Sequence, residues 1–326
     1  MKNNTFIKGF RKYFKQNLGI LIGLFLLCTV VSFMNENFLT TGNIMNVLRQ
    51  LFINANLSLG MCLVIITGGI DLTVGSTMGL CGTLTAGLIA LNGLNIWLAI
   101  LIGLLLGVLI GAVNGYIITK LDIAPFIVTM AVQMISRGAV YVYTDGLPIR
   151  SVQETFNNLG NGYIKGVPVT ILYTVFFTIV VWLILSRSRL GRHIYAVGGN
   201  RIAAQYSGIS ITKVNVWVYA ISGFLAAFAG IIYCGRMYSG QPTLGLGDEM
   251  NAIAAVVLGG TSFSGGIGTI GGVVIGILII AVLSNALNLL GLNTFWQQIV
   301  KGIVILLAVS IDVLKKRQEK PGAKAD

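Results

Sequence analysis

The chain has 326 residues, of which 55% are hydrophobic and only 10% are charged. Soluble domains carry about 25% charged residues, so this composition excludes a soluble globular protein and indicates one embedded in a membrane. The formal net charge of +12 is interpreted as a marker of orientation beside anionic lipid, and no nucleic-acid partner is expected. The four cysteines lie in apolar runs without metal or redox spacing, so neither a metal site nor a cofactor is predicted.

The apolar runs predict an all-α, polytopic membrane protein with about ten transmembrane helices and both termini in the cytoplasm. A helix needs about 20 apolar residues to cross a bilayer core, and continuous rather than alternating runs favour helices over a barrel. Residues 1–17 are predicted to form a basic cytoplasmic N-terminus, 18–313 the transmembrane domain and 314–326 a basic cytoplasmic tail. The predicted spans are 18–34, 47–67, 73–91, 96–118, 123–143, 168–186, 214–234, 249–263, 266–290 and 295–313.

The placement of basic residues predicts the orientation. Of the 22 Lys and Arg residues, 16 lie at the two ends, at Lys120 or in the loop 186–213. Because basic residues concentrate in cytoplasmic segments, both ends and this loop are predicted to lie inside, and loops 144–167 and 235–248 outside. The long outer loop could hold a short surface helix at 151–158, which either faces a partner or only connects two spans.

Two glycine-dense stretches, 67–76 and 259–268, interrupt the apolar spans. Each also carries Ser or Thr, so they are predicted either to pack tightly or to form broken helices along a pathway. The candidate pathway residues are Gly69, Asp71, Thr73, Ser76, Asn114, Gly259, Gly260, Thr261, Ser262 and Asn285. For the asparagines, hydrogen bonding between helices is the alternative. Gly103, Gly107, Gly111 and Gly115 share one helix face and predict close helix packing.

Few charges are expected within the spans. Asp71 stands just before the third span and could cap its N-terminus. Arg137 and Lys301 could lie near span ends and extend toward the headgroups, and Asp312 is a further candidate. Such scarcity of buried carboxylates argues against a carrier driven by a proton or sodium gradient.

The loop 186–213 is predicted to dock a soluble partner. It contains five basic residues. Its centre shows a short helical pattern with apolar residues at Ile202, Ala203, Tyr206 and Ile209. Gly198, Gly199 and Gly208 bracket that pattern.

No catalytic residues are predicted, and the chain is not expected to be an enzyme. A GxxxxGK[ST] nucleotide loop is absent from the sequence, and the single histidine, His193, has no Ser, Cys or acidic partner at catalytic spacing.

Four stretches of the chain stand out: GIDLTVGS at 69–76, PFIVT at 125–129, GRHIYAVGGN at 191–200 with Ala203, Ala204 and Ser207–Gly208–Ile209 after it, and the run 249–268 containing IAAVVLGGTS. With these stretches the chain resembles the permease subunits of bacterial ABC importers for monosaccharides, of the ribose, xylose and galactose type. Thr73 stands where the family usually has serine. The match extends through almost the whole chain.

The resemblance implies a multi-pass subunit of the bacterial inner membrane that forms the path for a monosaccharide, most simply ribose, with a second permease copy. It also implies a separate ATPase with two nucleotide-binding modules and an extracytoplasmic sugar-binding protein. The residues it implies for coupling to the ATPase are Gly191, Arg192, Ala196, Gly198, Gly199, Asn200, Ala203, Ala204 and Gly208.

Two alternatives remain open from the sequence. One is a permease of the same superfamily for nucleosides or branched-chain amino acids. The other is a stand-alone secondary carrier, which would transport without an ATPase.

Overall fold

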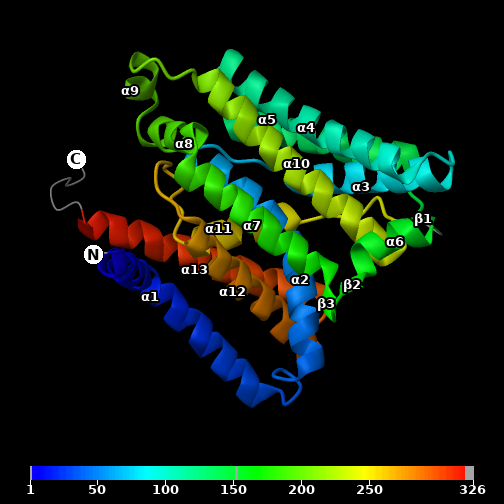
Figure 1. Ribbon diagram of the computed structural model, residues 1–326, viewed down its shortest axis with the longest axis horizontal. Helices are drawn as coiled ribbons and strands as arrows, with labels where there is room; N and C mark the ends of the chain where they lie inside the picture. The colour runs from blue at the N-terminus through cyan, green and yellow to red at the C-terminus, as the bar shows by residue number, and fades with distance from the viewer. Residues whose placement is uncertain (1, 151–152, 320–326) are drawn as a thin grey trace.

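A computed structural model describes residues 2–150 and 153–319 of the chain, most of them in helices (Figure 1). The main helices are α1 (Lys2–Met34), α2 (Thr41–Ile66), α3 (Val74–Ala90), α4 (Ile96–Lys120), α5 (Pro125–Thr144), α7 (Val169–Arg187), α10 (Ile211–Met237), α11 (Asp248–Leu258), α12 (Ile270–Leu289) and α13 (Thr294–Glu319). Three short helices complete the set: α6 (Glu154–Asn161), α8 (Arg189–Gly199) and α9 (Arg201–Tyr206).

A helix occupies each range that the sequence predicts as a span. Six of the described helices are long and apolar enough to cross a membrane, namely α2, α4, α5, α7, α10 and α12. Shorter apolar helices are formed by Leu18–Met34 and by α3. The predicted span 249–263 is wrong in its last third, because α11 ends at Leu258 after 11 residues and the chain from Gly259 to Thr269 is not helical.

The helices divide into an inner and an outer group. In α2, α10 and α12 the most apolar window is 78, 67 and 72% buried, whereas in α4, α5 and α7 only 22, 22 and 17% of it is buried. Side chains on α4 such as Leu101, Leu105 and Leu109 point outward. In water this exposure would be costly, and in lipid it is the expected surface. The outer helices therefore present the lipid-facing side of the molecule.

The glycines of α4 pack this helix closely against α10, as the sequence predicts. A Cβ at Gly111 would overlap the carbonyl oxygen of Tyr219, and one at Gly107 would overlap Ala227 and the carbonyl of Gly223. In lipid, helices associate through such close packing rather than through the hydrophobic effect. Gly103 and Gly115 lie on the same face, which is buried along its length.

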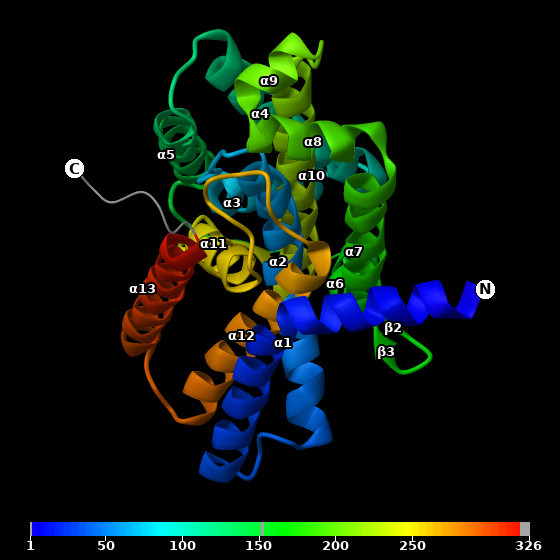
Figure 2. The same cartoon turned by 90° about the vertical axis from the view of Figure 1, so that its left-hand side faces the viewer.

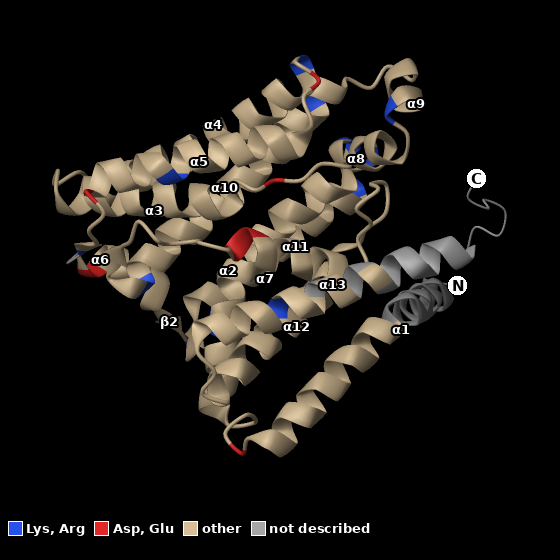
Figure 3. Cartoon of the chain, turned by 180° about the vertical axis from the view of Figure 1, so that it is seen from behind, with Lys and Arg blue, Asp and Glu red and all other residues tan. Residues whose placement is uncertain are grey.

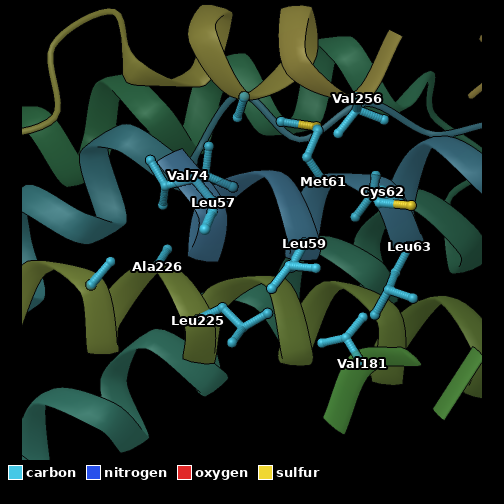
Figure 4. Close-up of a cluster of buried hydrophobic side chains, with 14 of the residues drawn as sticks. Leu57, Leu59, Met61, Cys62, Leu63, Val74, Val181, Leu225, Ala226 and Val256 are labelled. Carbon is cyan, nitrogen blue, oxygen red and sulfur yellow. The ribbon is translucent and has the colours of Figure 1, made fainter. Parts of the chain in front are cut away.

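The buried apolar core is centred on α2. Leu57, Leu59, Met61, Cys62 and Leu63 follow one another on this helix and are all 0–1% exposed. Figure 4 shows them surrounded by side chains from α3, α7, α10 and α11, including Val74, Val181, Leu225, Ala226 and Val256. A helix that is apolar on every side is one that neighbours enclose completely.

The two ends of the molecule differ in structure. Helices α8 and α9 lie on the same side as the first turns of α1 and the last turns of α13 (Figure 1). At the opposite side, β1 (Ile149–Arg150) pairs antiparallel with β4 (Ser239–Gly240), with Ile149 opposite Gly240. There β2 (Tyr163–Ile164) pairs antiparallel with β3 (Val167–Pro168), with Tyr163 opposite Pro168. The surface helix expected at 151–158 is α6, displaced toward 161; residues 151 and 152 lie outside the described part.

Candidate functional site

The loop 186–213, called here the basic segment, contains two helices where the sequence predicts one. The hydroxyl of Ser188 accepts a hydrogen bond from the backbone N–H of Gly191 (3.0 Å) and caps α8. The side chain of Asn200 accepts one from the N–H of Ala203 (2.9 Å) and caps α9. Side-chain oxygens at these positions satisfy amides that a helix start leaves unpaired. The apolar spacing of Leu190, Ile194 and Val197 is the sequence signal for the missed α8.

The end of α8 meets both glycine-dense stretches. A Cβ at Gly198 would overlap the carbonyl oxygen of Ile66, the last residue of α2, which also accepts a hydrogen bond from the N–H of Gly266 (2.8 Å). A Cβ at Gly265 would lie 2.8 Å from the oxygen of Gly198 and 3.1 Å from the nitrogen of Gly68. Three segments distant in sequence thus converge here. We call this contact of Ile66, Gly68, Gly198, Gly265 and Gly266 the glycine junction.

Tyr195 adds a second link between α8 and the non-helical chain after α11. Its hydroxyl donates a hydrogen bond to the carbonyl oxygen of Gly268 (2.7 Å). Burial raises the pKa of the Tyr195 phenol to about 12, with a smaller effect from Cys62. The hydroxyl therefore stays protonated, and remains a donor, throughout the physiological pH range.

Helix α9 presents an apolar surface outward. The side chains of Ile202 and Tyr206, four residues apart, are 68 and 90% exposed. Ala203 is exposed beside them, whereas Ala204 packs inward. The guanidinium of Arg201 pairs with Asp122 at 3.0 Å, with both side chains largely exposed. An exposed apolar pair at one end of a membrane protein is typical of a contact surface.

The remaining coupling candidates lie along the two helices. Gly191 is buried and Ala196 half-buried on α8, whereas Arg192 is exposed. Gly199 is exposed, with no atom near the position of a Cβ. Gly208 has a φ of +82°, a conformation that glycine adopts readily, and follows the end of α9.

Three of the pathway candidates form a buried polar cluster with Ser222 on α10. The carboxylate of Asp71 accepts hydrogen bonds from the backbone N–H of Thr73 (3.0 Å), from its hydroxyl (2.5 Å) and from the hydroxyl of Ser222 (2.8 Å). Asn114 on α4 donates to the hydroxyl of Thr73 (3.1 Å). The expected cap is corrected here, since Thr73 is the N-cap of α3 and Asp71 instead orders the preceding turn.

Asn285 pairs with another asparagine across the bundle. Its amide donates to the side-chain oxygen of Asn43 (2.7 Å) and accepts from the Asn43 amide (3.0 Å). This is the hydrogen bonding between helices that the sequence left as an alternative. Among the other candidates, Gly69, Ser76, Gly259, Thr261 and Ser262 are buried, and Gly260 is exposed with a φ of +81°.

The interior holds more charge than the sequence indicated. Arg137 lies in the middle of α5 and donates to the carbonyl oxygens of Pro242 (2.8 Å) and Leu244 (2.7 Å), so it does not extend to a span end. Glu249, in the acidic first turn of α11, is buried and accepts from Gln133 (3.1 Å). That turn is prominent in Figure 3 amid uncharged helices.

A polar cavity of about 430 Å³ lies beside α11, between α2, α10 and α13. Figure 2 shows α11 near α2, α12 and α13. The lining is rich in amides, contributed by Gln50, Asn54, Gln241, Asn251 and Asn288. A second cavity of about 830 Å³ between α11 and α13 shares Leu246, Asp248, Asn251 and Lys301 with the first. No group of residues able to hold a metal ion is found among the described residues.

The fold and these features define a polytopic helical membrane protein with exposed apolar side chains on α9 at one end and two adjoining cavities beside α11. A family model described as "branched-chain amino acid transport system / permease component" matches residues 43–309. The chain belongs to this permease family.

Several curated relatives cover the chain almost completely. The ribose import permease protein RbsC of Bacillus subtilis (strain 168) is 50% identical over 299 residues, 91% of this chain and 92% of the relative. The ribose import permease protein RbsC of Escherichia coli (strain K12) is 43% identical over 300 residues, 91% of this chain and 93% of the relative. The galactose/methyl galactoside import permease protein MglC of Escherichia coli (strain K12) is 35% identical over 331 residues, 96% of this chain and 98% of the relative. No solved structure matches. Together with six apolar helices, these relatives identify a multi-pass protein of the bacterial inner membrane.

Proposed function

We propose that this chain is the membrane subunit of an ABC importer that carries a monosaccharide, with ribose as the first candidate. The observation that supports this proposal most strongly is sequence similarity. The ribose permeases are 43–50% identical to this chain, whereas the galactose permease is 35% identical. We further propose that ten segments cross the membrane, with the 11-residue α11 crossing together with the non-helical chain that follows it. Residues 18–313 would then form the transmembrane domain, and both basic ends would lie in the cytoplasm.

The proposed partners are a second permease copy, an ATPase with two nucleotide-binding modules and an extracytoplasmic sugar-binding protein. ATP hydrolysis would belong to the ATPase. The apolar surface of α9, with Ile202 and Tyr206 exposed, supports a soluble partner at the cytoplasmic end. Closure of the ATPase would move α9, and α8 would carry that motion through the glycine junction to the end of α2 and to the chain after α11. A partner can drive this switch only by contacting the two states differently.

Reconstitution tests this function directly. Proteoliposomes containing the permease, its cognate ATPase and ribose-loaded binding protein should take up labelled ribose and hydrolyse ATP. Replacing Ala203 with Asp places a charge in the apolar contact surface of α9, where an unpaired charge is costly. We expect Ala203→Asp to abolish stimulated ATPase activity and uptake while the permease still inserts.

The matched control is Gln205→Asp, which adds the same charge at another exposed position on α9. It should retain most activity. Full ATPase stimulation in Ala203→Asp would reject the docking role. Uptake of leucine in place of ribose would favour the amino-acid alternative, and uptake without ATPase would favour the secondary carrier.

A further inference from the structure

The amide-lined cavity beside α11 combines features that suit a small neutral solute. Its volume of about 430 Å³ falls within the range of about 300–1,000 Å³ typical of ligand sites. Five of its lining residues carry side-chain amides, and its apolar lining includes Ile53 and Leu244. Polar groups facing a cavity inside a membrane bundle are costly to keep without partners, and so indicate function.

Most of the strong charges around this cavity already have partners within the protein. Lys301 and Asp248 attract each other, and the amide of Asn251 donates to the Asp248 carboxylate (3.1 Å). The guanidinium of Arg236 donates to the backbone oxygen of Arg49 (3.3 Å). The charges of Lys301 and Asp248 offset each other, which leaves Arg236 as the one uncompensated charge among the lining residues.

Three of the amides are free to bind. Within the described part of the chain, no hydrogen bond is made by the side chains of Gln50, Asn54 or Gln241. Asn288, by contrast, accepts from Gln297 (2.7 Å). Gln50 and Asn54 stand four residues apart on α2 and so lie on one face of that helix.

We propose that this cavity is a transient sugar site belonging to the permease itself, in which the amides of Gln50, Asn54 and Gln241 hydrogen-bond the hydroxyls of the passing monosaccharide. The proposal rests on the proposed transport function. An amide carries both donors and an acceptor, as a sugar hydroxyl does, so the pairing needs no charge. The ring of Tyr233, which also lines the cavity, offers an apolar face to the C–H side of a sugar.

A site of this kind contributes to transport without trapping its cargo. The cavity adjoins the larger one between α11 and α13, with which it shares four lining residues. Conduction needs binding that is favourable enough to admit a solute and weak enough to release it. The sugar-binding protein would supply the affinity, and the three amides would favour polyhydroxylated solutes during passage.

Leucine substitutions in the reconstituted complex test the site. Gln50→Leu and Asn54→Leu remove hydrogen bonding at similar size, and each should lower the maximal rate of labelled D-ribose uptake by about 5- to 10-fold, the effect of losing one hydrogen bond. ATPase activity stimulated by ribose-loaded binding protein should stay within about twofold of wild type, because the glycine junction and α9 are untouched. Asn54→Gln, which keeps an amide, should recover most of the uptake.

The control is Asn46→Leu, one turn earlier on α2 and outside the cavity lining, which should leave uptake unchanged. Normal uptake in both cavity variants would overturn the site while leaving the transport function intact, as would an equal fall of ATPase activity and uptake. A wild-type complex that takes up no ribose would overturn the proposed function and this site with it.

Chemical modification keeps the test open if the leucine variants fail to insert. Asn54→Cys should lose ribose uptake after treatment with a small methanethiosulfonate reagent, and excess ribose should slow that loss. Wild type treated in parallel accounts for the four native cysteines, three of which are buried. Unchanged uptake after complete modification of Asn54→Cys would overturn the proposal.

Discussion

Asp71 is a buried carboxylate that is held in place by hydrogen bonds from neighbouring residues. Its two carboxylate oxygens accept from Thr73 and from Ser222, and all three residues are buried. Such a cluster stabilises the fold only while every donor keeps its acceptor, because an unpaired buried polar group costs free energy. The cluster joins the start of α3 to α10, and through Asn114 to α4.

We expect Asp71→Asn to destabilise the protein by about 1–3 kcal/mol, the cost of leaving a buried donor facing another donor. The midpoint of thermal unfolding in detergent should fall. A thiol-reactive dye can follow unfolding, since Cys62, Cys81 and Cys234 are buried in the native state. Asp145→Asn is the control, because Asp145 is exposed and its φ of 49° suits asparagine. Equal midpoints for Asp71→Asn and wild type would contradict this role.

At the scale of residues, the sequence predicted local relations and missed distant ones. It linked Asp71 to the start of α3 because the two are adjacent, and the structure keeps that link through Thr73. Ser222 lies 151 positions away, and no local pattern connects it to Asp71. The same holds for Asn43 and Asn285, which are 242 positions apart.

At the scale of elements, the glycine junction implies that two neighbouring glycines, Gly198 and Gly199, differ in their tolerance of substitution. A methyl group at Gly198 would overlap the carbonyl of Ile66, which is backbone and cannot move aside cheaply. We expect Gly198→Ala to reduce stimulated ATPase activity and uptake at least tenfold in the reconstituted complex, since α8 would be pushed away from α2. Gly199→Ala, with no atom near its Cβ position, should behave like wild type.

The comparison separates a steric effect from a general need for glycine. If both variants lost activity to the same degree, flexibility rather than close approach would explain this pair. If neither did, α8 would not transmit motion through its contact with α2.

The length of the apolar runs predicted the positions of the long helices correctly, but it did not predict the short helices. The spans of α2, α4 and α12 are long apolar runs, and their positions agree with the prediction. Helix α11 has only 11 residues because Gly259 and Gly260 follow it, the latter with a φ of +81°. An apolar run counted as one span therefore combined a half-length helix with non-helical chain. Helix α8 was missed because its polar residues and glycines hide an apolar stripe of one residue per turn.

At the scale of the whole molecule, the orientation across the membrane can be tested with two exposed positions at opposite ends. Gln205 lies on α9 and Asn158 on α6, and both are exposed. In intact cells, an impermeant thiol reagent should label Asn158→Cys and spare Gln205→Cys, which should react only after the membrane is opened. The distribution of basic residues supplies the reason. Labelling of Gln205→Cys from outside would reverse the orientation.

The class of protein followed from composition, whereas the polar cavity did not. Its amides come from α2, from the chain before α11, from α11 itself and from α12, and only tertiary packing brings them together. The amides carry little periodic signal in the sequence, because only Gln50 and Asn54 lie on the same helix.

The hydrogen bond from the N–H of Gly266 to the carbonyl of Ile66 should protect this amide from hydrogen–deuterium exchange. An amide proton exchanges with deuterium only when its bond opens, so its exchange rate measures how often that opening occurs. This bond lies inside the contact between α2, α8 and the chain after α11. In a machine that switches between two states, deuterium uptake at this single amide would count the openings of the contact, independently of whether any sugar crosses.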